Sequence, residues 1–256
     1  MILQDKVVII TGAGPGMGQA MCRGAAREGA KVVVSARSAE AIEQIAHDIT
    51  SAGGEAIAVR CDVAQTEDCQ AIVQAALDKW GRVDGMVHSA YYHPDWGPIE
   101  SHSLDQVIQA LDVIAVGALR MAQAVIPTMR QQKSGSIVNI STLATRKPMP
   151  GEGGYAMAKA AVNQLTRQLA VELGGSGVRC NTALMGWMDG VPLEHFFDSQ
   201  GEAGKAFRAQ RASEIPVGHI PPDSACAKAV YFLLSDYASE MTGAALDVNG
   251  GDWVAP

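Results

Sequence analysis

A tyrosine and a lysine, Tyr155 and Lys159, stand four residues apart in a segment with helical periodicity. Residues at i and i+4 project from the same face of a helix, so the phenol and the ammonium would face the same space. A nearby positive charge favours the phenolate and lowers the phenol pKa from its ordinary value of about 10. The pair predicts a general acid that protonates a carbonyl and takes the proton back from an alcohol. Such spacing also arises by chance, so the prediction depends on further residues.

Two hydroxyl residues, Ser141 and Thr142, follow the apolar strand predicted at 137–140. Ligands of open α/β sheets bind at the carboxyl ends of the strands, where a hydroxyl could hold a substrate carbonyl. Both residues are also common turn formers. The residues alone leave these two interpretations open.

A glycine-rich turn, TGAGPGMG at 11–18, follows the first predicted strand. Gly12, Gly16 and Gly18 in the spacing GxxxGxG permit a tight turn, a close approach of the backbone to a pyrophosphate, and close packing of helix on strand. The diphosphate would lie at the positive end of the following helix, beside Met17. The turn predicts a dinucleotide site, with a glycine turn that binds nothing as the alternative.

The second predicted strand ends in Val-Ser-Ala-Arg at 34–37 and holds no carboxylate. At this distance from the glycine turn an acidic residue would bind the ribose of NAD, whereas a basic one suits the 2′-phosphate of NADP. Arg37 therefore favours NADP over NAD, unless it is only a solvated arginine. Asp62 and Val63 follow the third predicted strand and are candidates for adenine contacts, although Asp62 could equally cap a local turn.

Short β-branched runs alternate with longer segments of helical periodicity, which predicts a doubly wound parallel sheet with helices on both faces. The expected strands are 6–10, 31–34, 56–59, 83–87, 137–140 and 245–248, and the expected helices are 20–28, 39–52, 67–80, 104–129, 155–173 and 224–234. No linker divides residues 1–256, which favours one domain. The Gly- and Pro-rich interval 184–222 breaks the alternation and predicts a lid or binding loop.

Composition excludes several classes of function. The formal net charge of −7 disfavours nucleic acid and anionic membranes as partners. We find neither a basic leader nor 18 uninterrupted apolar residues, and expect a cytoplasmic protein. The five cysteines are widely spaced and form no CxxC motif, so we expect neither a disulfide framework nor a metal site.

Together, TGxxxGxG, a strand ending in Ser/Thr and YxxxK resemble the short-chain dehydrogenase/reductase family in its classical form, over essentially the whole chain. The resemblance implies a Rossmann-type domain and NAD(P)-dependent hydride transfer on alcohols or ketones. It implies Tyr155 as acid/base, Lys159 as the residue that binds the nicotinamide ribose and depresses the tyrosine pKa, and Thr142 as the substrate-orienting hydroxyl, with Ser141 beside it. It also suggests a homotetramer, and assigns Ala90, Gly186 and Met188 to the cofactor.

Three departures from the family pattern stand out. His88 replaces an asparagine after the fourth strand, and we interpret it as a hydrogen-bonded interior histidine. Ile114 replaces an asparagine that supports a water-linked proton relay to the lysine. Gly190 stands where the family places a threonine against the nicotinamide amide.

Aromatic and apolar residues gather in the loops predicted to face the site. They predict an apolar substrate pocket, although such residues could instead anchor the loops. The candidates are Tyr91, Tyr92, Trp96, Leu143, Met149, Met185, Trp187, Met188, Phe196 and Phe197. His93, in the same loop, is more typical of a solvent-facing histidine than of a proton carrier.

We therefore predict an NADP-preferring enzyme that interconverts a ketone and a secondary alcohol on a hydrophobic small molecule. One alternative is a 3-oxoacyl thioester reductase, which would need a basic patch for an acidic carrier; Arg120, Arg130 and Lys133 are few. The other is a non-catalytic NADP-binding sensor or scaffold, suggested by Ile114 and the altered segment at 88–91.

Overall fold

The computed structural model describes residues 1–254. The strands are β1 (Val7–Thr11), β2 (Lys31–Ser35), β3 (Glu55–Ala58), β4 (Gly85–His88), β5 (Gly135–Thr142), β6 (Val178–Met185) and β7 (Ala245–Val248). The α-helices are α1 (Met17–Arg27), α2 (Ala39–Ser51), α3 (Thr66–Trp80), α4 (Leu104–Ala110), α5 (Gly117–Gln132), α6 (Gly153–Glu172), α7 (Val191–Ser199), α8 (Gly201–Glu214) and α9 (Asp223–Leu234). A π-helical segment, η2 (Leu111–Val116), joins α4 to α5, and short 3-10 turns occur at η1 (Ile99–Ser101), η3 (Leu143–Thr145) and η4 (Asp236–Ala238).

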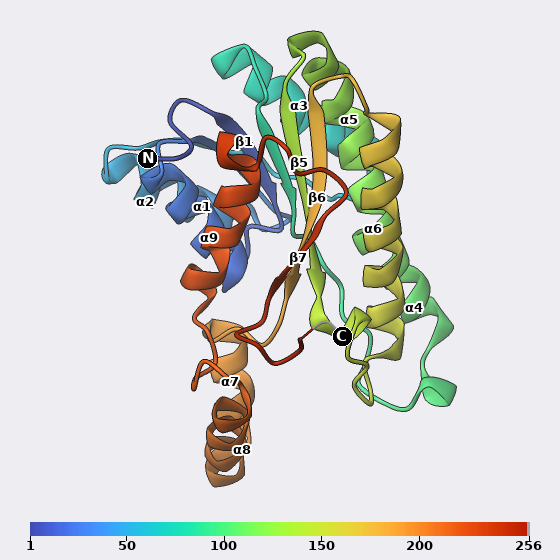
Figure 1. Cartoon of the computed structure of the whole chain (residues 1–256). Helices are drawn as coiled ribbons and strands as arrows, with labels where there is room; N and C mark the ends of the chain where they lie inside the picture. Colours follow the sequence, from blue (N-terminus) through green and yellow to red (C-terminus); the bar gives the residue numbers. More distant parts are fainter. Residues whose placement is uncertain (255–256) are drawn as a thin grey trace.

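The strands form one seven-stranded sheet in the order β3-β2-β1-β4-β5-β6-β7, and every neighbouring pair is parallel. The chain builds outward from β1 to β3, then returns and builds the other half from β4 to β7. The order reverses between β1 and β4, which is where ligands of such sheets bind. The predicted α/β, doubly wound Rossmann-type fold is confirmed (Figure 1).

Both faces of the sheet are covered, as the continuous apolar strands predict. Side chains alternate along β1, so Val8 and Ile10 pack with α1, α2 and α9, whereas Val7 and Ile9 pack with α3, α5 and α6. Figure 1 shows these two groups of helices on opposite sides of the sheet. The two buried faces fix the sheet and therefore the positions of its carboxyl ends.

The helix predicted at 104–129 is one continuous run with a π-helical break in its middle. By length and composition the run 104–132 could cross a membrane, and 39% of its apolar stretch is buried inside the protein. Asp112 and Arg120 interrupt its apolar residues and pair with each other at 2.8 Å. Buried residues such as Met121 and Val125 pack onto the sheet, so much of its apolar surface has partners inside the protein.

The interval 184–222 contains α7 and α8, which extend beyond the carboxyl ends of the strands (Figure 1). A small apolar cluster of Phe197, Ile215 and Ile220, with Trp187 against it, holds this segment together. It lies next to the edge of the sheet at which the predicted site residues gather.

Candidate active site

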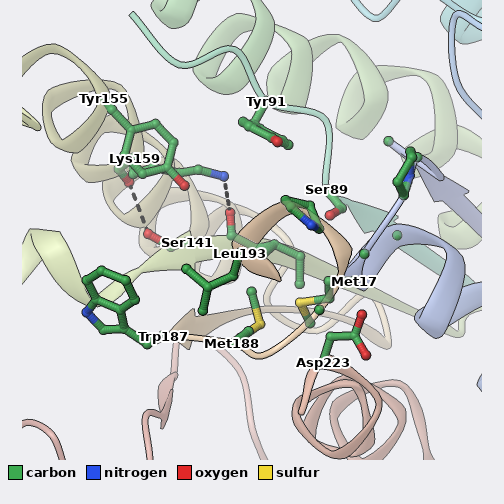
Figure 2. A pocket seen from close by; sticks show the side chains of 18 residues that line it. Met17, Ser89, Tyr91, Ser141, Tyr155, Lys159, Trp187, Met188, Leu193 and Asp223 are labelled. Atoms are coloured by element: carbon green, nitrogen blue, oxygen red, sulfur yellow. Dashed lines mark hydrogen bonds between the residues drawn. The ribbon is translucent and has the colours of Figure 1, made fainter. Parts of the chain in front are cut away.

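The helix α6 carries Tyr155 and Lys159 to the carboxyl end of β5. Lys159 is 2% exposed, and its Nζ donates a hydrogen bond of 2.7 Å to the carbonyl oxygen of Ile140. The same ammonium lies 5.7 Å from the centre of the Tyr155 ring, and the Ser141 hydroxyl donates to the Lys159 carbonyl at 3.5 Å. Figure 2 shows these side chains together on one wall of a cavity.

The electrostatics of this pair differ from the sequence-based prediction. Burial lowers the pKa of Lys159 to about 7. Burial raises the pKa of Tyr155 above its ordinary value, and the neighbouring Glu152 and Tyr91 act in the same direction. Lys159, whose ammonium is held by the Ile140 carbonyl, adds no lowering to the pKa of Tyr155. The phenol is protonated at neutral pH, the form that donates a proton to a carbonyl.

Ser141 and Thr142 point to different places, because successive side chains of a strand alternate. Ser141 is buried and lines the cavity beside the glycine turn. Thr142 is half-buried and lines a second cavity together with Tyr155. Its Oγ1 accepts a hydrogen bond of 3.3 Å from the Ala144 amide, which leaves the hydroxyl proton to donate elsewhere. This placement favours Thr142 over Ser141 as a contact for a substrate oxygen.

The glycine turn forms a cradle at the start of α1. Gly12 and Gly16 have positive φ values of 71° and 86°, which L side chains rarely adopt. A Cβ on Gly12 would lie 2.5 Å from the Ala90 nitrogen, and one on Gly18 would lie 2.1 Å from the Gly12 oxygen. No side chain caps the N-terminus of α1, and the Gln19 amide donates to the Gly14 carbonyl at 3.0 Å, which leaves the amides of Met17 and Gly18 for a ligand. The cradle fits a diphosphate.

A cavity of about 420 Å³ runs from this turn to Tyr155 and Lys159. Met17 and Met188 line it, as predicted for the cofactor, while Gly186 lies instead on the second cavity. Gly186 packs closely against Asn249: a Cβ added to Gly186 would lie 2.8 Å from the Cβ of Asn249. These residues would hold the nicotinamide half of the dinucleotide.

A smaller pocket of about 150 Å³ follows at the other end of the turn, and Arg37, Asp62, Val63 and Ala90 line it. The Arg37 side chain is exposed and, within residues 1–254, forms no ion pair. Asp62 accepts a hydrogen bond of 3.0 Å from the Ala64 amide, so one of its oxygens caps a local turn. The pocket has the position and the polar groups that an adenosine would need.

The second cavity, of about 600 Å³, is mostly apolar and adjoins the first. It is lined by His93, Trp96, Thr142, Leu143, Ala144, Met149, Glu152, Tyr155, Gly186, Trp187, Leu193 and Phe196. Tyr155, Trp187 and Leu193 line both cavities, so the phenol stands at their junction. A small molecule in the second cavity would meet a nicotinamide in the first beside Tyr155.

The predicted pocket residues separate into groups. Trp96, Leu143, Met149, Trp187 and Phe196 line the second cavity. Tyr91 and Met188 line the first, Tyr92 packs on the α4–α6 contact, and Met185 lies in the sheet core. Phe197 is 2% exposed and belongs to the α7–α8 cluster, because it is on the inner face of α7. Sequence reasoning missed Glu152, Ala144 and Leu193; the position of Glu152 one turn before Tyr155 was an available signal.

The departures from the family pattern have structural explanations. His88 is 1% exposed, its Nδ1 lies 3.2 Å from the Thr11 hydroxyl, and burial with the Lys159 charge lowers its pKa to about 3. This is the hydrogen-bonded interior histidine that was expected. Among the described residues, no group of three side chains that could hold a metal ion is found. A Cβ on Gly190 would lie 2.7 Å from a carboxylate oxygen of Asp223, so this side chain would have to shift to admit a threonine. Ile114 is fully buried in η2.

Comparison with known proteins places this geometry in a family. Residues 12–252 match the family profile described as Enoyl-(Acyl carrier protein) reductase. The chain is 33% identical over 250 residues to 2,5-dichloro-2,5-cyclohexadiene-1,4-diol dehydrogenase of Sphingobium indicum, covering 97% of each chain. It is 32% identical over 249 residues to 2-(R)-hydroxypropyl-CoM dehydrogenase of Xanthobacter autotrophicus, covering 96% of this chain and 98% of the relative.

Solved structures agree. The crystal structure of levodione reductase superposes with a TM-score of 0.91 at 29% identity, covering 97% of this chain and 98% of the other. A short-chain dehydrogenase/reductase from Burkholderia xenovorans gives the same TM-score at 30% identity, with 98% and 97% coverage. The fold, the profile and the relatives agree: the chain is an oxidoreductase that belongs to the short-chain dehydrogenase/reductase family, whose members depend on NAD or NADP.

Proposed function

We propose that the protein interconverts a ketone and a secondary alcohol on a hydrophobic small molecule, with NADP as the preferred cofactor. The observation that carries this proposal is the position of Tyr155 at the junction of the two cavities. A proton donor at this junction contacts both the first cavity, beside the glycine turn, and the second, apolar cavity. The volume of about 600 Å³ suits a ring-sized substrate.

Each polar group has a separate role. Tyr155 gives a proton to the carbonyl oxygen and recovers it from the alcohol. Thr142 donates its free hydroxyl proton to the same oxygen and orients it. When bound, the nicotinamide supplies or accepts the hydride. Lys159, at the bottom of the first cavity, binds the cofactor ribose and exchanges protons near neutral pH.

The relatives support a cyclic substrate, since one of them is a dehydrogenase of a cyclohexadiene diol. The alternative of a 3-oxoacyl thioester reductase has less support, because Arg120 pairs with Asp112 and is not free for an acidic carrier. The alternative of a non-catalytic sensor rests on Ile114 and His88, neither of which displaces Tyr155 from the cavities.

The cofactor preference rests on Arg37 at the rim of the small pocket and on the absence of an acidic residue at Ala36. A guanidinium can grip a 2′-phosphate with two parallel hydrogen bonds. We also infer that residues 184–222 act as a lid within one domain, since Leu193 and Phe196 of α7 reach the second cavity.

We further infer a homotetramer in the cytoplasm. Exposed apolar side chains lie on the long helical run and on α6, including Leu104, Ile108 and Val171 at 76%, 61% and 79% exposure. Apolar patches of this kind are typical of surfaces that associate. Light scattering at micromolar concentration should give four chains per particle; a monomer would contradict this inference.

Assays of cyclic and linear ketones and alcohols with NADP(H) and NAD(H) test the function. Turnover is measured as the change in nicotinamide absorbance. We expect turnover of cyclic ketones, faster with NADPH, and its loss in Tyr155→Phe. Binding of the cofactor with no turnover of any carbonyl would favour the sensor instead.

A further inference from the structure

Two polar side chains of the second cavity, His93 and Glu152, have no part in the proposed reaction. Thr142 and Tyr155 face the reacting oxygen, and most of the remaining wall is apolar. Polar groups in an apolar pocket usually fix the orientation of a ligand. A substrate with one oxygen would leave His93 and Glu152 without a partner.

The hydrogen bonding of His93 defines what this side chain can recognise. Its Nδ1 lies 2.7 Å from the Pro94 carbonyl oxygen, which can only accept, so Nδ1 carries the proton. In the neutral ring Nε2 is then an acceptor. The ring stacks on Tyr155 with centroids 4.7 Å apart and on Trp96 at 5.8 Å, which holds it in place. His93 therefore presents a fixed acceptor next to the catalytic phenol.

Glu152 supplies a second acceptor. It precedes the first residue of α6, yet its side chain caps no amide of that helix. Within residues 1–254, the Glu152 carboxylate forms no ion pair and accepts no hydrogen bond from a side chain. Asp95 and Asp112, by contrast, each accept one, from Gln106 and Arg120. Burial raises the pKa of Glu152, and a positive charge on His93 would offset part of this effect. A partly desolvated carboxylate of this kind gains most from a ligand that donates a hydrogen bond.

We propose that His93 and Glu152 together bind a second hydroxyl group of the substrate, so the preferred substrate is a ring-sized diol or hydroxyketone. This inference rests on the proposed function and deepens it. A hydroxyl has one proton and donates it to one acceptor at a time, so Glu152 and Nε2 of His93 are alternative acceptors for it, and either one selects a hydroxyl over an ether or a second carbonyl at that position. A cavity of about 600 Å³ has room for a six-membered ring.

The test compares cyclohexane-1,4-diol with cyclohexanol and 4-methoxycyclohexanol, in oxidation with NADP⁺. A hydrogen bond to a charged group changes an affinity by roughly 10- to 150-fold. We therefore expect kcat/KM for the diol to exceed that for either competitor by about 10-fold or more. The ratio should fall in Glu152→Gln and in His93→Phe, which keeps the stacked ring, and should approach one when the two substitutions are combined. Glu194→Gln, which removes an exposed carboxylate of α7, is the matched control and should retain the ratio.

Binding measured without turnover separates this inference from the proposed function. Trp96 and Trp187 line the cavity, so their fluorescence reports the dissociation constants of the diol and of cyclohexanol on the enzyme with NADP⁺. Tighter, Glu152-dependent binding of the diol supports the second-hydroxyl site even if no alcohol is oxidised. Equal constants for both ligands, or a preference for the methoxy compound, overturn it, even if Tyr155-dependent oxidation of cyclohexanol is found.

Discussion

The ammonium of Lys159 donates to the carbonyl oxygen of Ile140 at 2.7 Å, while the centre of the Tyr155 ring is 5.7 Å away. The lysine is thus anchored to the end of β5 and is oriented by the strand. Loss of Lys159 would remove a buried bond as well as a charge beside the phenol. The two residues of the YxxxK motif should therefore respond differently to substitution.

Tyr155→Phe should lower kcat for ketone reduction by at least about 10²-fold, because general acid catalysis contributes that much. The ring and its packing remain, so the dissociation constant of NADPH should change little. Lys159→Ala should weaken cofactor binding and turnover together. Steady-state kinetics and fluorescence titration with NADPH measure both effects; near-normal turnover in Tyr155→Phe would refute the acid assignment.

Thr142→Val keeps the shape of the side chain and removes its hydroxyl. We expect a loss of about 10²- to 10³-fold in kcat, the usual effect of deleting one donor to a developing oxyanion. Ser141→Ala should have a much smaller effect, because Ser141 faces the other cavity. The reverse order of the two variants would move the orienting role to Ser141.

The choice between these hydroxyls shows what sequence could not supply. The motifs predicted the doubly wound sheet and the gathering of Gly12, Tyr155 and Lys159, since strand ends of a parallel sheet share one edge. Which of two adjacent hydroxyls faces the substrate depends on how β5 is rotated in the sheet. Phe197 is a further example, because the sequence does not show which face of α7 is turned inward. We expected Phe197 in the pocket, but it lies on the inner face of α7 and is buried with Ile215 and Ile220.

The π-helical segment is a second example. Apolar spacing at 104–129 is the same for an uninterrupted helix and for one that contains η2, so periodicity could not reveal the break. The direction of the Tyr155 pKa shift could not be predicted from the sequence either, because it depends on burial and on the neighbouring Glu152 and Tyr91.

The burial of Lys159 predicts a pH dependence of stability. Its pKa is about 7 in the folded protein against 10.5 ordinarily, so between these values the unfolded chain binds the extra proton. The free energy of unfolding should then rise with pH across this window, by at most about 1.4 kcal/mol per pH unit, and show no such contribution below pH 7. Urea unfolding of wild type and Lys159→Met from about pH 6 to 9.5 isolates the effect. A constant difference between the two proteins would contradict it.

Ile114→Asn should destabilise the protein without raising turnover. Ile114 is fully buried and packs with Ala110, Ala118, Ala158 and Val162, so asparagine would place an amide in an apolar cluster. Burying it costs about 1 to 3 kcal/mol, whereas the control Ile114→Val should cost about 0.5 to 1.5 kcal/mol. Thermal unfolding and steady-state kinetics are the measurements. An asparagine variant with wild-type stability and faster turnover would show that η2 can accommodate a water relay.

Cofactor selectivity should depend on Arg37 and on the absence of a carboxylate at Ala36. A carboxylate there would repel a 2′-phosphate and bind the ribose hydroxyls of NADH, whereas the exposed guanidinium is free to bind the phosphate. One charge-assisted hydrogen bond contributes about 1.5 to 3 kcal/mol, or roughly 10- to 150-fold, and salt reduces this at an exposed rim. Pro15 stands in the turn where a second basic residue would strengthen the preference, so it should be moderate.

Dissociation constants for NADPH and NADH, measured at low and high salt, test this preference. Wild type should bind NADPH more tightly, with the difference shrinking as salt increases. Ala36→Asp/Arg37→Ala should reverse the order, because the variant loses the phosphate contact and gains a ribose acceptor. Arg60→Ala removes an exposed arginine that does not line the adenosine pocket and should leave the ratio unchanged. Tighter binding of NADH by the wild type would overturn the assignment of NADP.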